Sequence, residues 1–260
     1  MWHHLTLYPA LLRQQLKVLL EYRVDFLVGA GSSIIVNITY LGTLSLIMAR
    51  VPSLNGWTLP ELLLIYGLML MSRALMDTFA GSFWSIGGFV RRGRFDAYLV
   101  RPLNPLFSFL TSRFDTTGVG TFLIGLAVVA TAGQALDLFM PLNLAYLVLT
   151  VFCGAVIYFS INLITASSAF WIVDAMPVVA AVFESNNFAH YPLTIFPKAI
   201  GFLVTWIVPY GFAAFYPAAH LMGRDVGALA WLAPVVAAVL FVLGYHVWLA
   251  GLRRYESTGS

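Results

Sequence analysis

The sequence predicts an all-α polytopic membrane protein with six transmembrane helices. Hydrophobic residues make up 60% of the chain and charged residues only 10%, whereas soluble domains carry roughly 25% charged residues. The mean hydropathy is +0.87. Long apolar stretches recur along the chain, and the basic residues gather at their ends. This composition excludes a soluble domain, and the basic residues form no stripe that would bind nucleic acid. We expect a single transmembrane domain over residues 1–260.

The first predicted element is an amphipathic helix over residues 5–23. Leucines recur there at helical spacing, whereas Arg13, Lys17 and Glu21 follow one another at intervals of four on another face. Such a helix lies in the membrane interface with its leucines toward the lipid. It could be a simple anchor, or a lever that touches a cytoplasmic partner.

The transmembrane helices follow from stretches that are nearly free of charge. A membrane helix needs about 20 predominantly apolar residues. The predicted spans cover residues 26–49, 62–86, 116–136, 142–171, 175–189 and 226–252.

The distribution of basic residues decides the number of spans. With six spans, the N-terminal helix, the basic segment of residues 87–105 and the terminal pair Arg253 and Arg254 all lie on the cytoplasmic side, where positive charge is retained. Seven spans would place that pair outside. Six is therefore the better count, and both termini are expected to be cytoplasmic.

Two apolar pieces between residues 175 and 223 compete to be the fifth span. Assigning residues 175–189 to it leaves residues 191–221 as an external re-entrant element, and the opposite assignment remains open. Prolines divide the second piece into short segments, as a re-entrant element requires, although a long kinked helix would carry them too. These prolines and their aromatic neighbours are Tyr191, Pro192, Phe196, Pro197 and Pro209.

The basic segment of residues 87–105 reads GGFVRRGRFDAYLVRPLNP and lies between spans two and three. It holds four arginines against one aspartate, with glycines near its start and prolines at its end, which indicates a short cytoplasmic helix. Our hypothesis is that a soluble partner docks on it. The alternative is a basic loop that only sets the topology.

Arg73 and Asp77 interrupt the second span. Each would cost about 2.5–3.5 kcal/mol at the centre of a membrane helix, so the two should face protein or water. Their spacing of four residues places them on one helix face, where they can pair. They form either a structural clamp between helices or a charge pair lining a cavity that polar headgroups or substrates meet.

The sequence gives little support for catalysis. It contains no phosphate-binding loop of the GxxxxGK[ST] type and no HExxH or CxxC motif. The single cysteine, Cys153, allows no disulfide within the chain, and the scattered histidines do not have the spacing of metal ligands. We therefore predict no catalytic residues, no metal site and no cofactor in this chain.

Several motifs together resemble the membrane subunits of type-2 ABC exporters, especially a bacterial branch of six-span permeases. The motifs are EYRVDF at residues 21–26, GGFVRRGRFDAYLVRPLNP at 87–105, YPLTIFP at 191–197 and RRYESTGS at 253–260. In that family the loop between spans two and three is the coupling helix that docks on the ATPase, and the N-terminal helix lies beside it. The re-entrant pieces between spans five and six close the external gate. The resemblance thus implies ATPase coupling through Arg91, Arg92, Gly93, Arg94, Phe95, Asp96, Arg101 and Pro102.

The resemblance further implies a permease subunit of an ATP-driven exporter in the bacterial inner membrane. Its partners would be two copies of an ABC ATPase, which bind ATP and Mg, and a second permease, identical or, as is common in this branch, different. An apolar chain with aromatic-rich spans suits an amphiphilic or lipid-like cargo. The alternative is an ATP-independent carrier or channel, which would need ionisable residues in several spans, whereas only Arg73 and Asp77 are clearly central.

Overall fold

The computed structural model describes residues 23–111, 117–172 and 174–255. These residues are helical apart from turns and one isolated bridge between Leu54 and Trp57. The predicted interface helix, with Arg13, Lys17 and Glu21, lies outside the described residues and stays a prediction.

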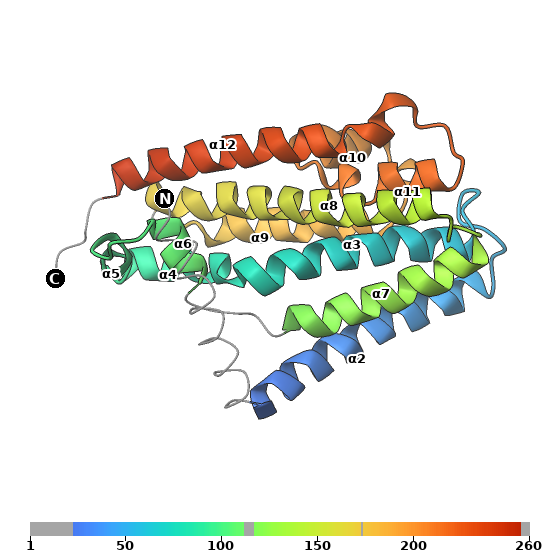
Figure 1. Ribbon diagram of the computed structural model, residues 1–260, viewed down its shortest axis with the longest axis horizontal. Coiled ribbons are helices and arrows are strands. Elements are labelled where there is room, and N and C mark those ends of the chain that lie inside the picture. Colours follow the sequence, from blue (N-terminus) through green and yellow to red (C-terminus); the bar gives the residue numbers. More distant parts are fainter. Residues whose placement is uncertain (1–22, 112–116, 173, 256–260) are drawn as a thin grey trace.

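The five long apolar helices of the described residues run side by side, roughly along the long axis of the molecule (Figure 1). Helix α3 lies in the middle of this layer and packs against α7 and α8, α2 covers α7, and α12 packs on the opposite side of α8. The side chains of Leu64, Leu68 and Met69 in α3 are fully buried, as expected for the central helix of the layer. The five helices are α2 (Arg23–Met48), α3 (Leu59–Ala80), α7 (Thr117–Ala135), α8 (Pro141–Ser167) and α12 (Ala233–Arg254).

Within the described residues, five helices are long and apolar enough to cross a membrane, or six if one bent pair counts as a single span. This finding confirms an all-helical, multi-span membrane protein. The second of these candidates runs from Leu59 to Arg91, because α3 continues through a 3₁₀ helix, η1 (Gly81–Ser85), into α4 (Ile86–Arg91).

The predicted fifth span corresponds to two shorter elements. Helix α9 (Met176–Ser185) has ten residues and continues as the 3₁₀ helix η3 (Asn186–His190). Together they extend about 25 Å if straight, because the 3₁₀ helix rises more steeply than the α-helix. Helix α9 alone is too short to span a hydrocarbon core of about 30 Å, so the boundaries of this span remain a prediction.

The bent pair lies at the end of the molecule opposite α4 and consists of two short arms (Figure 1). The first arm is α10 (Lys198–Phe202), which continues as a π-helix, η5 (Leu203–Ile207). Pro209 follows, and the second arm comprises η6 (Tyr210–Phe212) and α11 (Phe215–Leu221). The arms form an angle of 79°, and the proline between them cannot continue the helical hydrogen bonds.

Candidate coupling and gate sites

The basic segment of residues 87–105 contains a sharp turn at Gly93. Helix α4 ends there with the amide of Gly93 donating to the carbonyl of Val90 at 3.1 Å and that of Arg94 donating to Phe89 at 3.0 Å. Gly93 has a φ of 64°, which glycine adopts without the steric cost that a side chain brings. The chain then forms a second short helix, α5 (Asp96–Leu99). The structure therefore has two short helices around Gly93, where the sequence predicted a single one.

The end of the segment is set by Asn104 and Pro105. The side chain of Asn104 accepts hydrogen bonds from the amides of Leu106 at 2.9 Å and Phe107 at 3.3 Å. It thereby caps α6 (Pro105–Leu110), whose first residue is a proline that needs no amide hydrogen there. The prolines thus end the basic segment, as predicted.

Phe95 anchors the segment in the protein interior. Its side chain is completely buried. Aromatic rings from α5, α6, α12 and the 3₁₀ turn η2 (Ser168–Phe170) that follows α8 surround it, and all ring centroids lie within 6.0 Å. These rings belong to Tyr98, Phe109, Phe170, Trp248 and Tyr255. Phe95 therefore packs the segment against the ends of α8 and α12, and its side chain does not lie on the surface.

Tyr255, the residue that follows α12, lies near the carboxylate of Asp96. Burial raises the pKa of Tyr255 to about 12, and the neighbouring carboxylate of Asp96 adds to the shift. The tyrosine is therefore neutral throughout the physiological range and can donate a hydrogen bond.

The four arginines of the segment differ in their surroundings. Nη1 of Arg91 lies 3.5 Å from Oδ1 of Asp174. Arg101 donates to the hydroxyl of Ser108 at 3.2 Å and stacks over the ring of Tyr98. Arg92 and Arg94 are exposed, as is Pro102.

Two apolar side chains at the tip of the segment are also exposed. Val100 is 82% exposed and Leu99 is 41% exposed, next to Arg101 and Pro102. Apolar side chains beside arginines are typical of protein interfaces. We refer to residues 92–102 below as the tip. The sequence analysis missed Leu99 and Val100 because their exposure depends on the turn at Gly93.

The polar pair inside the second span forms as predicted. Nε of Arg73 lies 3.3 Å from Oδ2 of Asp77, and both side chains are about three-quarters buried. The guanidinium group also lies 4.5 Å from the ring centroid of Phe183 on α9, which favours the cation.

Further polar side chains complete this region. The hydroxyl of Tyr158 on α8 donates to Oδ1 of Asn186 at 2.5 Å and its ring stacks on Tyr210. They enclose, with Arg73 and Asp77, a cavity of about 10 Å³, which holds about one water molecule. The region thus joins α3, α8, η3 and η6. The sequence analysis missed Tyr158 and Tyr210, since a tyrosine in an apolar run is usually a packing residue.

The predicted gate residues lie around the start and the bend of the two arms. Tyr191 packs against Tyr40 and Phe196, and Phe196 in turn contacts Phe188 in edge-to-face geometry. Pro192 is buried, Pro197 immediately precedes α10, and Pro209 separates the arms.

A clamp that the sequence analysis did not predict fixes both ends of this region to the loop between α2 and α3. Arg224 donates to Oε1 of Glu61 through Nε at 3.0 Å and through an Nη at 2.8 Å, and its guanidinium group lies 3.7 Å from the ring centroid of Trp57. The indole nitrogen of Trp57 donates to the hydroxyl of Thr194 at 2.8 Å. We call these four residues the loop clamp. Thr194 precedes the first arm and Arg224 follows the second. The chain therefore contacts this loop both before and after the bend.

In the part of the chain that the structure describes, no group of three or more His, Cys, Asp or Glu side chains has the geometry of a metal site. The described residues form an exposed tip tied to two long helices, a polar region between helices, and a clamped bend at the opposite end.

The model of a family described as ABC-2 family transporter protein matches residues 34–259. No curated protein matches the chain.

Proposed function

The chain belongs to the ABC-2 family of transporter membrane proteins, and we propose that it is the permease subunit of an ATP-driven exporter whose ATPase docks on the tip. The single observation that carries this proposal is the position of Phe95. It is buried among rings of α5, α6, η2 and α12, while Arg92 and Arg94 before it and Leu99 and Val100 after it are exposed. A partner that moves the tip therefore moves helices that cross the membrane.

The tip has the composition of a docking surface. Arg92 and Arg94 are exposed on one side of Phe95, and Leu99 and Val100 on the other. An apolar contact can provide affinity, and the guanidinium groups can provide orientation toward carboxylates on the ATPase. Arg91, Gly93, Asp96, Arg101 and Pro102 shape or flank this surface.

The distribution of charge supports a cytoplasmic position for the tip. Helices α4 and α5 and the C-terminal end of α12, with Arg253 and Arg254, lie at the same end of the molecule (Figure 1). Positive charge is retained on the cytoplasmic side during insertion. We therefore propose that both termini are cytoplasmic and that the protein lies in a bacterial plasma membrane. The membrane-interface helix of residues 5–23 would lie at the same side.

The clamped bend is proposed as the external gate. Because Thr194 and Arg224 contact the same loop, the two arms would enter and leave the membrane on one side, which supports a re-entrant element over residues 191–221. Irregular backbone at that depth needs cover from protein. Phe212 and Ala213 at the bend are completely buried. Helices α9 and η3 would then form the fifth of six spans.

The translocation path is proposed to lie between this chain and a second permease, identical or related. Two ATPase copies would bind ATP and Mg, and this chain would bind neither. The polar region around Arg73 and Asp77 would meet the polar part of an amphiphilic cargo, because its charges are only partly buried. Closure of the ATPase dimer would push the tip and change the exposure of the path.

Purification in mild detergent tests this function. An affinity-tagged chain is expected to retain a stoichiometric ATPase, and the purified complex should hydrolyse ATP. Replacing Arg92 and Arg94 by glutamate should release the ATPase while leaving the chain folded. An ATP-independent carrier would purify without an ATPase and would move its cargo alone.

A further inference from the structure

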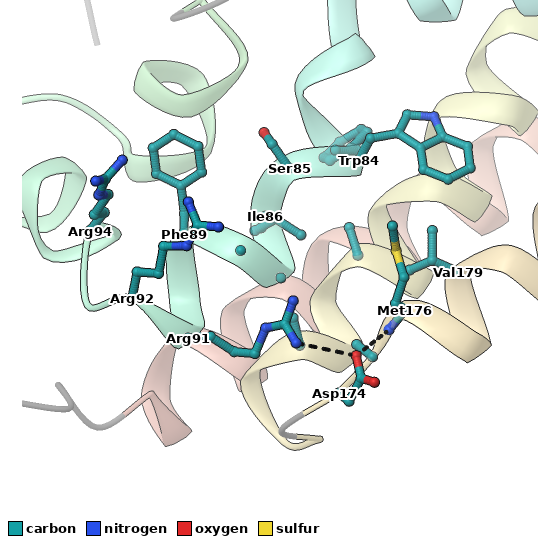
Figure 2. Close-up of a pocket in the computed structure, with 16 residues that line it drawn as sticks. Trp84, Ser85, Ile86, Phe89, Arg91, Arg92, Arg94, Asp174, Met176 and Val179 are labelled. Atoms are coloured by element: carbon teal, nitrogen blue, oxygen red, sulfur yellow. Dashed lines mark hydrogen bonds and ion pairs between the residues drawn. The ribbon is translucent and has the colours of Figure 1, made fainter.

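A pocket of about 330 Å³ lies between the basic segment and α9 (Figure 2). In Figure 2, Arg92 and Arg94 lie on one side of the pocket, Trp84, Met176 and Val179 lie on the other, and Arg91 points toward Asp174 below. The pocket is therefore basic on one wall and apolar on the other. Its volume is within the range of small-molecule sites, about 300–1,000 Å³.

The pocket lies at the depth of lipid headgroups. Helix α3 has 22 residues and is about 33 Å long, whereas the hydrocarbon core of a bilayer is about 30 Å thick. Helix α3 can therefore cross the core alone, and η1 and α4 that follow it lie at the interface. Trp84 is 38% exposed in η1, in agreement with the enrichment of tryptophan at this depth.

The charges in the pocket favour an anion. Three guanidinium groups line it, and Asp174 is the one acidic side chain among the described residues that do so. Asp174 pairs with Arg91 at 3.5 Å through half-exposed side chains, which is a weak and replaceable contact. Guanidinium groups bind phosphate oxygens through paired, charge-assisted hydrogen bonds. The apolar wall beside them suits the first methylene groups of an acyl chain.

We propose that this pocket binds an anionic, phosphate-bearing lipid, with the phosphate at Arg91 and Arg92 and the start of an acyl chain against Trp84, Met176 and Val179. The inference deepens the proposed function, on which the assignment to the cytoplasmic leaflet rests. Because Arg91 ends α4 and the tip begins at Arg92, a bound lipid also touches the start of the segment that the ATPase is proposed to move.

Photolabelling of the full chain tests the site without the ATPase. The chain is placed in phosphatidylcholine nanodiscs that contain phosphatidylglycerol with a diazirine close to its headgroup. Illumination should attach the label to the peptides that contain Trp84 or Met176. Free inorganic phosphate in excess should leave the labelling unchanged, whereas unlabelled phosphatidylglycerol should compete.

Two variants probe the two walls separately. Arg91→Gln together with Arg92→Gln should reduce the labelling about tenfold or more, because charge-assisted contacts to the phosphate are lost. Gly88→Leu should reduce it by occupying the pocket, since a Cβ atom at Gly88 meets nothing within 4 Å. Gly42→Leu is the matched control, because Gly42 in α2 also has open space around it and lies outside the pocket.

Equal labelling of the wild type, Gly88→Leu and the arginine variant would overturn the proposal. So would labelling that free phosphate abolishes, because the site would then bind a soluble anion. Retention of the ATPase by the tagged chain is measured separately. If the tagged chain does not retain an ATPase but is still labelled by the lipid, the proposed function is contradicted and the lipid site is supported.

Discussion

Arg224 and Glu61, which are 163 residues apart, are joined by two hydrogen bonds to a single carboxylate oxygen. The other oxygen of Glu61 accepts from the amide and the hydroxyl of Thr58 at 2.7 and 2.9 Å. Because Arg224 also donates to the carbonyl of Gly56, it holds the loop before α3 against the chain that leaves the second arm. The proposed gate is therefore fixed at its end by charge-assisted contacts.

Glu61→Gln is expected to loosen this clamp. The neutral amide accepts weaker hydrogen bonds from Arg224, and the melting temperature should fall by an amount equivalent to about 2 kcal/mol. Thermal unfolding in detergent, followed by tryptophan fluorescence, measures the change. Arg50→Gln is the control, since Arg50 is exposed in the same loop. An equal melting temperature for both variants would contradict a stabilising clamp.

Phe95→Ala is expected to remove the anchor of the tip. Truncating a fully buried phenylalanine costs about 3–5 kcal/mol, and the tip should lose its connection to α12. ATP hydrolysis by the assembled complex should then proceed with reduced transport. Phe152→Ala is the control for a phenylalanine that is 64% exposed, and it should affect neither stability nor transport. Full transport by the Phe95 variant would contradict the anchoring role.

Gly93→Ala is expected to strain the turn between α4 and α5. An alanine with a φ near 64° costs about 1–2 kcal/mol, because its Cβ atom approaches the following carbonyl. Gly93→Asn should be milder, since asparagine adopts this conformation more readily. The amount of ATPase that each tagged variant retains measures the effect. If alanine is tolerated better than asparagine, the turn is not what positions the tip.

Asp77→Asn is expected to impair transport more than assembly. It leaves the partly buried guanidinium group of Arg73 without its counter-ion, at a cost of about 1–3 kcal/mol. The double variant Arg73→Leu with Asp77→Leu should regain stability without regaining transport. If both variants assemble and transport normally, the charge pair has no role in transport.

The sequence anticipated the features that depend on local periodicity. The long apolar helices follow from stretches without charge, and the contact between Arg73 and Asp77 follows from a spacing of four on one helix. Trp57 and Arg224 show where such reasoning stops. Trp57 lies in the loop before α3, and it is only 3% exposed because Arg224 and Phe215 cover it from a distant part of the chain. Pairing across that distance leaves no local periodicity.

The tip shows a second limit of sequence reasoning. A single helix was predicted over the basic segment, with Gly93 loosening its start. Gly93 instead ends α4, and this turn brings Phe95 inside and leaves Val100 outside. The alternation of buried and exposed residues thus depends on one backbone angle.

Cysteine crosslinking at Val100 tests the central claim most directly. The single native cysteine, Cys153, is buried, so Val100→Cys in a Cys153→Ser background provides one reactive thiol at a highly exposed point of the tip. The account predicts that a short bifunctional reagent crosslinks this thiol to the ATPase in the assembled complex, and that a membrane-impermeant maleimide added to intact cells leaves it unlabelled. Labelling of Val100→Cys from outside the cell, with no crosslink to an ATPase, would contradict it.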